Sequence, residues 1–134
     1  MKVFLDTNVW LSATIFSGLC EELVIQCAER GCLLSSTLVQ AEAHEVLARK
    51  FPQKPTVGAL FDASWQVALL LPDVADPADD NDQRLVAAAE MGGVTLFVTG
   101  DKRVLGWKAR AAMRIVSPRE AWVMLQDGAE RSVL

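Results

Sequence analysis

Hydrophobic and polar residues follow one another in blocks that predict short buried strands separated by helices. Continuous or nearly continuous apolar runs of a few residues are typical of strands that are covered on both faces. Such runs occur at residues 3–5, 32–34, 94–98 and 114–117. The sequence therefore predicts strands at these four positions.

Apolar residues spaced three or four positions apart predict helices between these strands. In residues 18–30, Leu19, Leu23 and Cys27 recur at this spacing, and Gly31 follows the expected end of the helix. Further helices are expected at residues 38–50, 83–91, 102–107 and 118–125.

The segment before the longest loop is ambiguous. Residues 56–70 have a helical pattern, but the apolar run "VALLL" at residues 67–71 also fits a strand. The loop "PDVADPADDND" follows, and Asp82 at its end is expected to cap the helix over residues 83–91.

The alternation of strands and helices predicts an α/β fold with a mostly parallel central sheet between two layers of helices. The 134 residues fit a single domain over residues 1–134. No repeat or linker interrupts the pattern. We therefore expect one three-layer α/β/α domain.

Composition and the N-terminal residues indicate where in the cell the protein is expected. No apolar run reaches the ~18 residues that a membrane span needs, and the N-terminal residues lack the basic and apolar regions of a signal peptide. The spacing of Cys20, Cys27 and Cys32 fits no zinc site, so we expect buried free thiols. A cytoplasmic protein without a membrane partner is predicted.

Charge is distributed unevenly along the chain. Residues 1–100 hold 13 acidic and 6 basic side chains, whereas residues 101–120 hold 6 basic and 2 acidic ones. An acidic protein with one basic stretch is not a general nucleic-acid coat, but it can hold a phosphate backbone locally. The acidic excess is also compatible with a metal site.

Carboxylates follow the strands at the ends where open α/β sheets bind ligands. Asp6 comes directly after the first strand, and Asp101 follows the strand at residues 94–98. Asp82 starts the helix that leads into the strand at residues 94–98, and Glu42 lies early in the helix that follows the strand at residues 32–34. Four clustered carboxylates repel one another unless a cation lies between them. Mg²⁺ or Mn²⁺, one or two ions per site, is the natural candidate, and its chemistry there is phosphodiester hydrolysis.

These motifs together resemble the PIN domain, and in order and spacing they cover nearly the whole chain. The resemblance rests on "FLDTNVWLSA" at 4–13, "LVQAEAHEVLARKF" at 38–51, "DPADDNDQRLVAAAE" at 76–90, "LFVTGDKRVL" at 96–105 and "RIVSPREAW" at 114–122.

The resemblance implies a metal-dependent endoribonuclease. It implies that Asp6, Glu42, Asp82 and Asp101 are the catalytic metal ligands, and that Asn8 and Thr99 are supporting residues. The chain's small size is similar to that of VapC-type toxins of toxin–antitoxin pairs. This similarity implies an RNA substrate, a protein antitoxin and a homodimer.

Several alternatives stay open. Asp79 competes with Asp82 as a ligand, and Glu45 competes with Glu42. Asp6 alone also fits as the cap of a helix over residues 8–13. Lys102 and Arg103 are candidates to contact substrate phosphate, or simply begin a solvated helix.

Two other functions are also compatible with the residues. One is a PIN-like module that binds RNA or protein without catalysis. The other is a phosphatase that uses Asp6 as a nucleophile, although such enzymes usually have a second Asp where this chain has Asn8.

Overall fold

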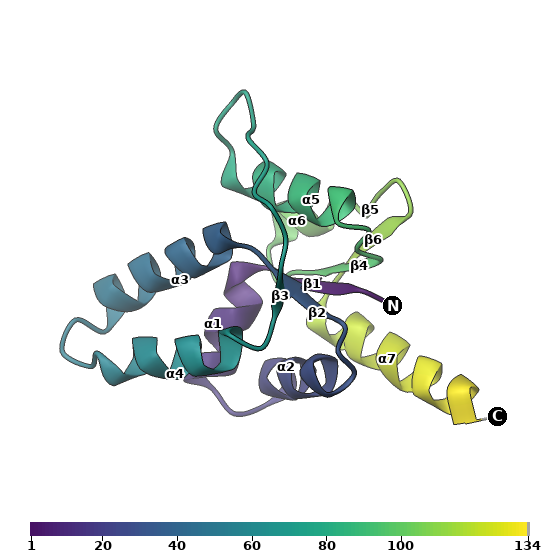
Figure 1. The fold of residues 1–134 in the computed structure, drawn as a ribbon, viewed down its shortest axis with the longest axis horizontal. Helices are drawn as coiled ribbons and strands as arrows, with labels where there is room; N and C mark the ends of the chain where they lie inside the picture. Colours follow the sequence, from purple (N-terminus) through teal and green to yellow (C-terminus); the bar gives the residue numbers. More distant parts are fainter. Residues whose placement is uncertain (134) are drawn as a thin grey trace.

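Six short strands form one sheet in the order β3-β2-β1-β4-β6-β5, at the centre of the computed structural model in Figure 1. Neighbours from β3 to β6 are parallel, whereas the edge strand β5 is antiparallel to β6. The structure describes residues 1–133, with side chains described for residues 1–127. The strands are β1 Val3–Leu5, β2 Leu33–Ser35, β3 Leu69–Leu70, β4 Leu96–Val98, β5 Ala109–Arg110 and β6 Met113–Val116.

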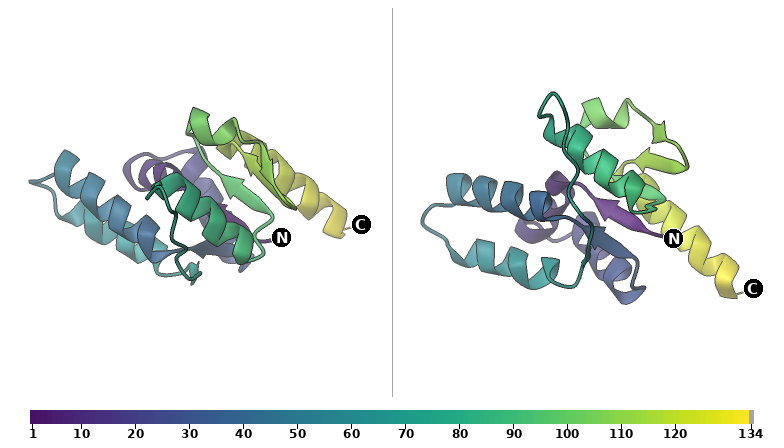
Figure 2. Two further views of the ribbon diagram at one scale, coloured as in Figure 1. Left: turned by 90° about the horizontal axis from the view of Figure 1, so that it is seen from above. Right: turned by 45° about the horizontal axis from the view of Figure 1, so that its top comes forward.

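Helices lie on both sides of this sheet, so the predicted three-layer α/β/α fold is confirmed (Figures 1 and 2). In Figure 1, α5 and α6 lie above the strands, and α2 and α7 lie below them. The helices are α1 Thr7–Ile15, α2 Leu19–Glu29, α3 Thr37–Lys50, α4 Thr56–Trp65, α5 Asn81–Met91, α6 Lys102–Leu105 and α7 Pro118–Val133.

The four predicted strands are present: β1 has the predicted ends, and the ends of the other three are shifted by no more than two residues. The ambiguous segment before the loop contains both structures, because α4 ends at Trp65 and β3 follows it. Other elements are longer than the pattern predicted or were not predicted. A nine-residue helix, α1, follows β1 at once, the edge strand β5 was not expected, and α7 continues to Val133 rather than ending near residue 125.

The core lies on both faces of the central strands. All three residues of β1 are fully buried, which explains their continuous apolar run. Phe4 of β1 and Phe97 of β4 are partners in the sheet, and their rings stack at 5.4 Å between centroids. At the other side of β1, the Trp65 indole donates a buried hydrogen bond of 2.9 Å to the Ser35 hydroxyl of β2.

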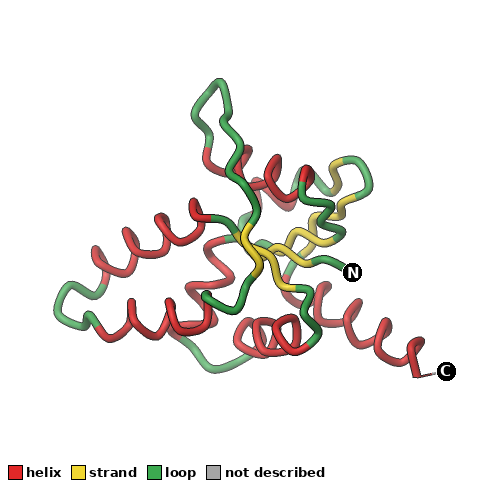
Figure 3. The backbone as a smooth tube through the Cα atoms, viewed as in Figure 1, coloured by secondary structure: helices red, strands yellow, loops and turns green. Residues whose placement is uncertain are grey.

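Helices α3 and α4 form a hairpin that projects from one end of the sheet (Figures 1 and 3). Nε2 of His44 on α3 lies 2.7 Å from Oδ1 of Asp62 on α4, and both side chains are partly exposed. This contact joins the two helices on the hairpin surface.

No single helix among the described residues is long and apolar enough to cross a membrane. In this part of the chain, one pair of helices, α1 and α2, passes the same test together, and the two helices meet at a bend of 108°. The three cysteines are free thiols, but only Cys27 is buried as predicted, whereas Cys20 and Cys32 are partly exposed.

Candidate active site

Asp6 lies at the carboxyl end of β1, where it caps α1 and is only 4% exposed. Its Oδ1 accepts a hydrogen bond of 2.8 Å from the backbone N–H of Thr7. Its Oδ2 accepts bonds from the Thr99 hydroxyl at 2.8 Å and from the Asn8 amide at 3.1 Å. The two predicted supporting residues therefore both contact Asp6, and the helix-cap alternative for Asp6 is also correct.

Asn8 and Thr99 also fix the loop after β4. Oδ1 of Asn8 accepts a bond of 2.9 Å from the backbone N–H of Gly100, and the Thr99 hydroxyl accepts one of 3.0 Å from that of Asp101. The ends of β1 and β4 are thus joined through side chains, because adjacent parallel strands end at the same edge of the sheet.

The pKa of Asp6 is raised from 3.8 to about 6, chiefly because burial disfavours the charged carboxylate. Hydrogen bonds from Thr99 and Thr7 oppose this shift, whereas the charges of Asp82 and Glu42 add to it. Three carboxylates from β1, α3 and α5 are therefore close enough to repel one another.

Glu42 on α3 is held by two residues that sequence reasoning did not single out. The Thr7 hydroxyl donates a bond of 2.6 Å to its Oε1, and the Asn81 amide donates one of 3.1 Å to its Oε2. Thr7 directly follows Asp6, and Asn81 directly precedes Asp82. In the sequence, the only signal for Thr7 and Asn81 was that each is a polar residue next to a candidate acid.

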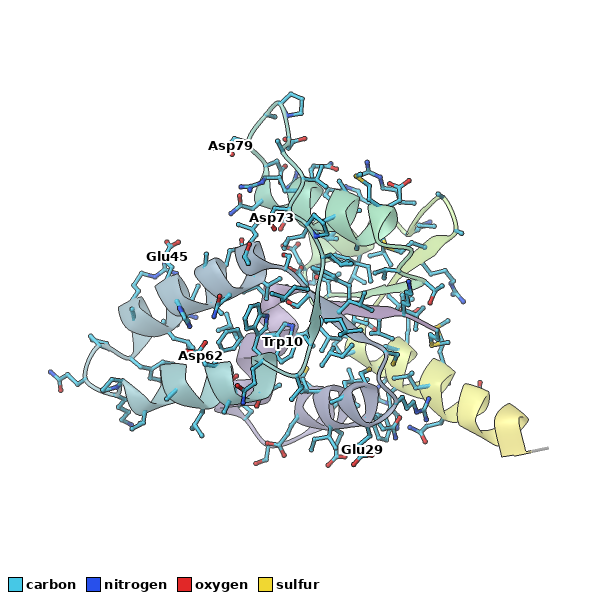
Figure 4. All side chains as sticks on the ribbon, in the orientation of Figure 1. Trp10, Glu29, Glu45, Asp62, Asp73 and Asp79 are labelled. Atoms are coloured by element: carbon cyan, nitrogen blue, oxygen red, sulfur yellow. The ribbon has the colours of Figure 1, made fainter. Side chains whose placement is uncertain are left out.

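Glu45, the alternative to Glu42, points away from this edge of the sheet (Figure 4). Its side chain is 75% exposed, and its Oε1 lies 3.8 Å from Nη1 of Arg49, one helical turn further on. Glu42 is the one that contacts the residues around Asp6.

The loop before α5 corrects one prediction, because Asp80 rather than Asp82 caps the helix. The Asp80 carboxylate accepts bonds from the backbone N–H groups of Asp82 at 3.0 Å and Gln83 at 3.3 Å. The helix begins at Asn81, two residues earlier than the pattern suggested. Asp82 is therefore in the first turn, and its carboxylate contacts the Arg103 guanidinium rather than the start of the helix.

Asp79, the alternative ligand, lies next to the tip of this loop and is exposed (Figure 4). Its φ of 53° is in the left-handed region. The pKa of Asp82, in contrast, is raised by partial burial and then by the charges of Asp101 and Asp80. Asp82 is therefore the loop acid that lies near Asp101 and Glu42.

Asp101 caps the short helix α6, since its Oδ1 accepts a bond of 2.8 Å from the backbone N–H of Arg103. We call Asp6, Glu42, Asp82 and Asp101 the acid cluster. They come from four separate elements, as the sequence predicted, and they meet at the carboxyl edge of the sheet. Lys102 is exposed, whereas the Arg103 guanidinium contacts Asp80 and Asp82.

A cavity of about 390 Å³ adjoins the acid cluster. It is bordered by α1, the start of α2, the loop after β4 and the first residue of α7. Its lining combines two residues already described, Asn8 and Asp101, with mostly apolar or small neighbours. The lining residues are Asn8, Val9, Ser12, Cys20, Gly100, Asp101 and Pro118.

The acid side chains are engaged by the protein itself. Glu42 is bonded to Thr7 and Asn81, and Asp82 to Arg103. Among the side chains that the structure describes, no three His, Cys, Asp or Glu residues are arranged to hold a metal ion. The chain matches no known protein-family model, and no curated protein matches it in sequence.

Proposed function

We propose that this protein is a metal-dependent endoribonuclease that hydrolyses RNA phosphodiester bonds with the acid cluster. The observation that carries the proposal is the buried Asp6 carboxylate, whose charge is opposed both by burial and by two neighbouring carboxylates. Burying a carboxylate beside two others costs stability, and a divalent ion bound among the three carboxylates would offset that cost.

The donor set fits a divalent ion. The acid cluster supplies only carboxylate oxygens, which Mg²⁺ and Mn²⁺ prefer over nitrogen or sulfur donors. The Arg103 guanidinium already contacts the Asp82 carboxylate, which supports the view that this edge attracts a cation. Asp6, Glu42, Asp82 and Asp101 are the residues that would hold the ion, and Glu42 and Asp82 would exchange hydrogen-bond partners to do so.

A divalent ion in such a site polarises the phosphate and lowers the pKa of water. The chain's own residues would set the geometry. Thr99 and Asn8 orient the Asp6 carboxylate, and Thr7 orients Glu42. The adjoining cavity offers space for a nucleotide next to the scissile phosphate. Lys102 is exposed beside Asp101 and is available to contact the RNA backbone.

The proposal extends to the family and the biological role. We infer a PIN-like domain, as the sequence motifs suggest, and a VapC-type toxin with a protein antitoxin and a homodimeric assembly. The order of the motif residues along the chain and their convergence at one sheet edge support this inference.

The test is cleavage of a mixed RNA pool in Mn²⁺, Mg²⁺ or EDTA. Asp101→Asn and Asp82→Asn are expected to lower the rate by at least about a hundredfold, more than groups that only position a ligand usually cost. Asn is as good a helix cap as Asp, so Asp101→Asn leaves the start of α6 intact. Asp79→Asn is the matched control, since Asn tolerates the left-handed backbone at that position.

Metal-dependent cleavage that Asp79→Asn retains and the other two variants lose would support the nuclease. Wild-type cleavage rates in Asp101→Asn and Asp82→Asn would contradict it. The engagement of Glu42 and Asp82 by neighbouring side chains favours one other function, a binding module without catalysis. RNA binding that needs no metal, without cleavage, would favour that module.

A further inference from the structure

A cation from the chain itself lies on the acid cluster. Nη1 of Arg103 donates a hydrogen bond of 3.1 Å to Oδ2 of Asp82. Its Nη2 donates to Oδ2 of Asp80, and its guanidinium lies over the Trp107 ring, 5.2 Å from the ring centroid. One arginine therefore joins an acid of the cluster to an acid outside it.

Asp80 is the fixed end of this bridge. Its carboxylate also accepts two backbone N–H groups at the start of α5, so its position is set by the helix. The guanidinium beside Asp80 lowers the pKa of that carboxyl. Asp82 has no such backbone bonds among the described contacts, and its own carboxylate is the more readily exchanged partner.

Electrostatics favours replacement of Arg103 by a divalent ion at Asp82. The Arg103 side chain is 54% exposed, and exposed ion pairs with single charges are weak. A divalent ion doubles the charge and meets several carboxylates at once, so it competes well for Asp82. The bonds to Asp80 and the stacking on Trp107 would keep the guanidinium beside the site after it loses Asp82.

We propose that Arg103 competes with the divalent ion for Asp82 and, once displaced, binds a phosphate of the RNA. This inference rests on the proposed function, because it needs the ion at the acid cluster. Arg103 would thus have two successive partners, first Asp82 and then the substrate. Without the divalent ion, Arg103 neutralises Asp82. With the ion bound, the positive charge of Arg103 faces the substrate.

Calorimetric titration with Mn²⁺, without RNA, tests the first half. Arg103→Gln keeps a polar side chain at this position but removes the charge, so Mn²⁺ is expected to bind about threefold more tightly or better. Arg103→Lys keeps the charge but loses the planar guanidinium group. Its Mn²⁺ affinity is expected to lie between those of Arg103→Gln and wild type.

Arg110→Gln is the matched control. Arg110 is 42% exposed and its Nε lies 2.5 Å from Oε2 of Glu90, which is on the same helix as Asp82 but at its other end. Its Mn²⁺ affinity should equal that of wild type. Equal affinities in Arg103→Gln, Arg110→Gln and wild type would overturn the inference and leave the metal site standing. Failure of all three proteins to bind Mn²⁺ would overturn the proposed function as well.

The salt dependence of RNA cleavage in saturating Mn²⁺ tests the second half. One single-strand phosphate contact contributes about 0.7 to the slope of log(kcat/KM) against log[salt]. Arg103→Gln is expected to flatten the slope by about this amount, whereas Arg110→Gln should not. An unchanged slope in Arg103→Gln would refute the phosphate contact.

Discussion

The buried Asp6 carboxylate is expected to make the metal-free protein lose stability as the pH rises. The pKa of Asp6 is raised from 3.8 to about 6, mainly by burial. Between these two values the folded protein holds the proton and the unfolded chain does not. The free energy of unfolding therefore falls with increasing pH.

The size of the effect follows from the shift. At 1.36 kcal/mol per pKa unit, Asp6 accounts for about 3 kcal/mol of lost stability by neutral pH. About half of this loss, roughly 1.5 kcal/mol, falls between pH 5 and pH 7.5, because the loss begins at the unfolded pKa and ends above the folded one.

Urea unfolding in EDTA, at pH 5 and pH 7.5, measures this loss in wild type and in Asp6→Asn. The variant has no proton to exchange at this position, so its stability should fall by about 1.5 kcal/mol less between the two pH values. Comparing the two pH dependences cancels the other titrating groups and any constant cost of the amide. If the free energy of unfolding falls equally in wild type and in Asp6→Asn, ionisation of the buried Asp6 carboxylate does not cause the loss of stability.

Two further predictions concern the residues around the site and the core. Thr7→Val removes the hydroxyl that donates a hydrogen bond of 2.6 Å to Glu42, and we expect a 10- to 100-fold loss of Mn²⁺ affinity, as is typical when a metal ligand loses its orienting partner. The control is Thr37→Val, which removes an exposed hydrogen bond of 2.8 Å to Asp73. Equal Mn²⁺ affinities of the two variants, measured by calorimetry, would contradict the role of Thr7. Trp65→Phe removes the buried hydrogen bond to Ser35 and should lower the free energy of unfolding, measured by urea titration, by about 1–3 kcal/mol. A change below about 0.5 kcal/mol would mean that this hydrogen bond contributes little to stability.

The acid cluster shows why sequence patterns found the acids but not their partners. Asp6 and Asp101 follow apolar runs, and parallel strands bring such positions to one edge. Thr7 and Asn81 carry no periodic or compositional signal that separates them from other polar residues. Their role depends on where α3 and α5 lie relative to β1, which is a property of the packed fold.

The loop before α5 gives a sharper example. Four Asp residues stand between residues 76 and 82, and each is a plausible cap or ligand by type. Local hydrogen bonds decide that Asp80 is the cap, whereas Asp79 has a left-handed backbone and an exposed side chain. Counting along the sequence placed the helix start two residues late.

The sequence by itself determined the α/β class, the buried strands and the edge of the sheet at which the acids gather. These features follow from local periodicity and from the single direction in which parallel strands run. Only the tertiary structure decided that Arg103 reaches back across 21 residues to Asp82, and that Thr7 holds Glu42. Such contacts join residues that are distant in the chain, so they depend on the angles and distances at which whole elements pack, which no local pattern of residues encodes.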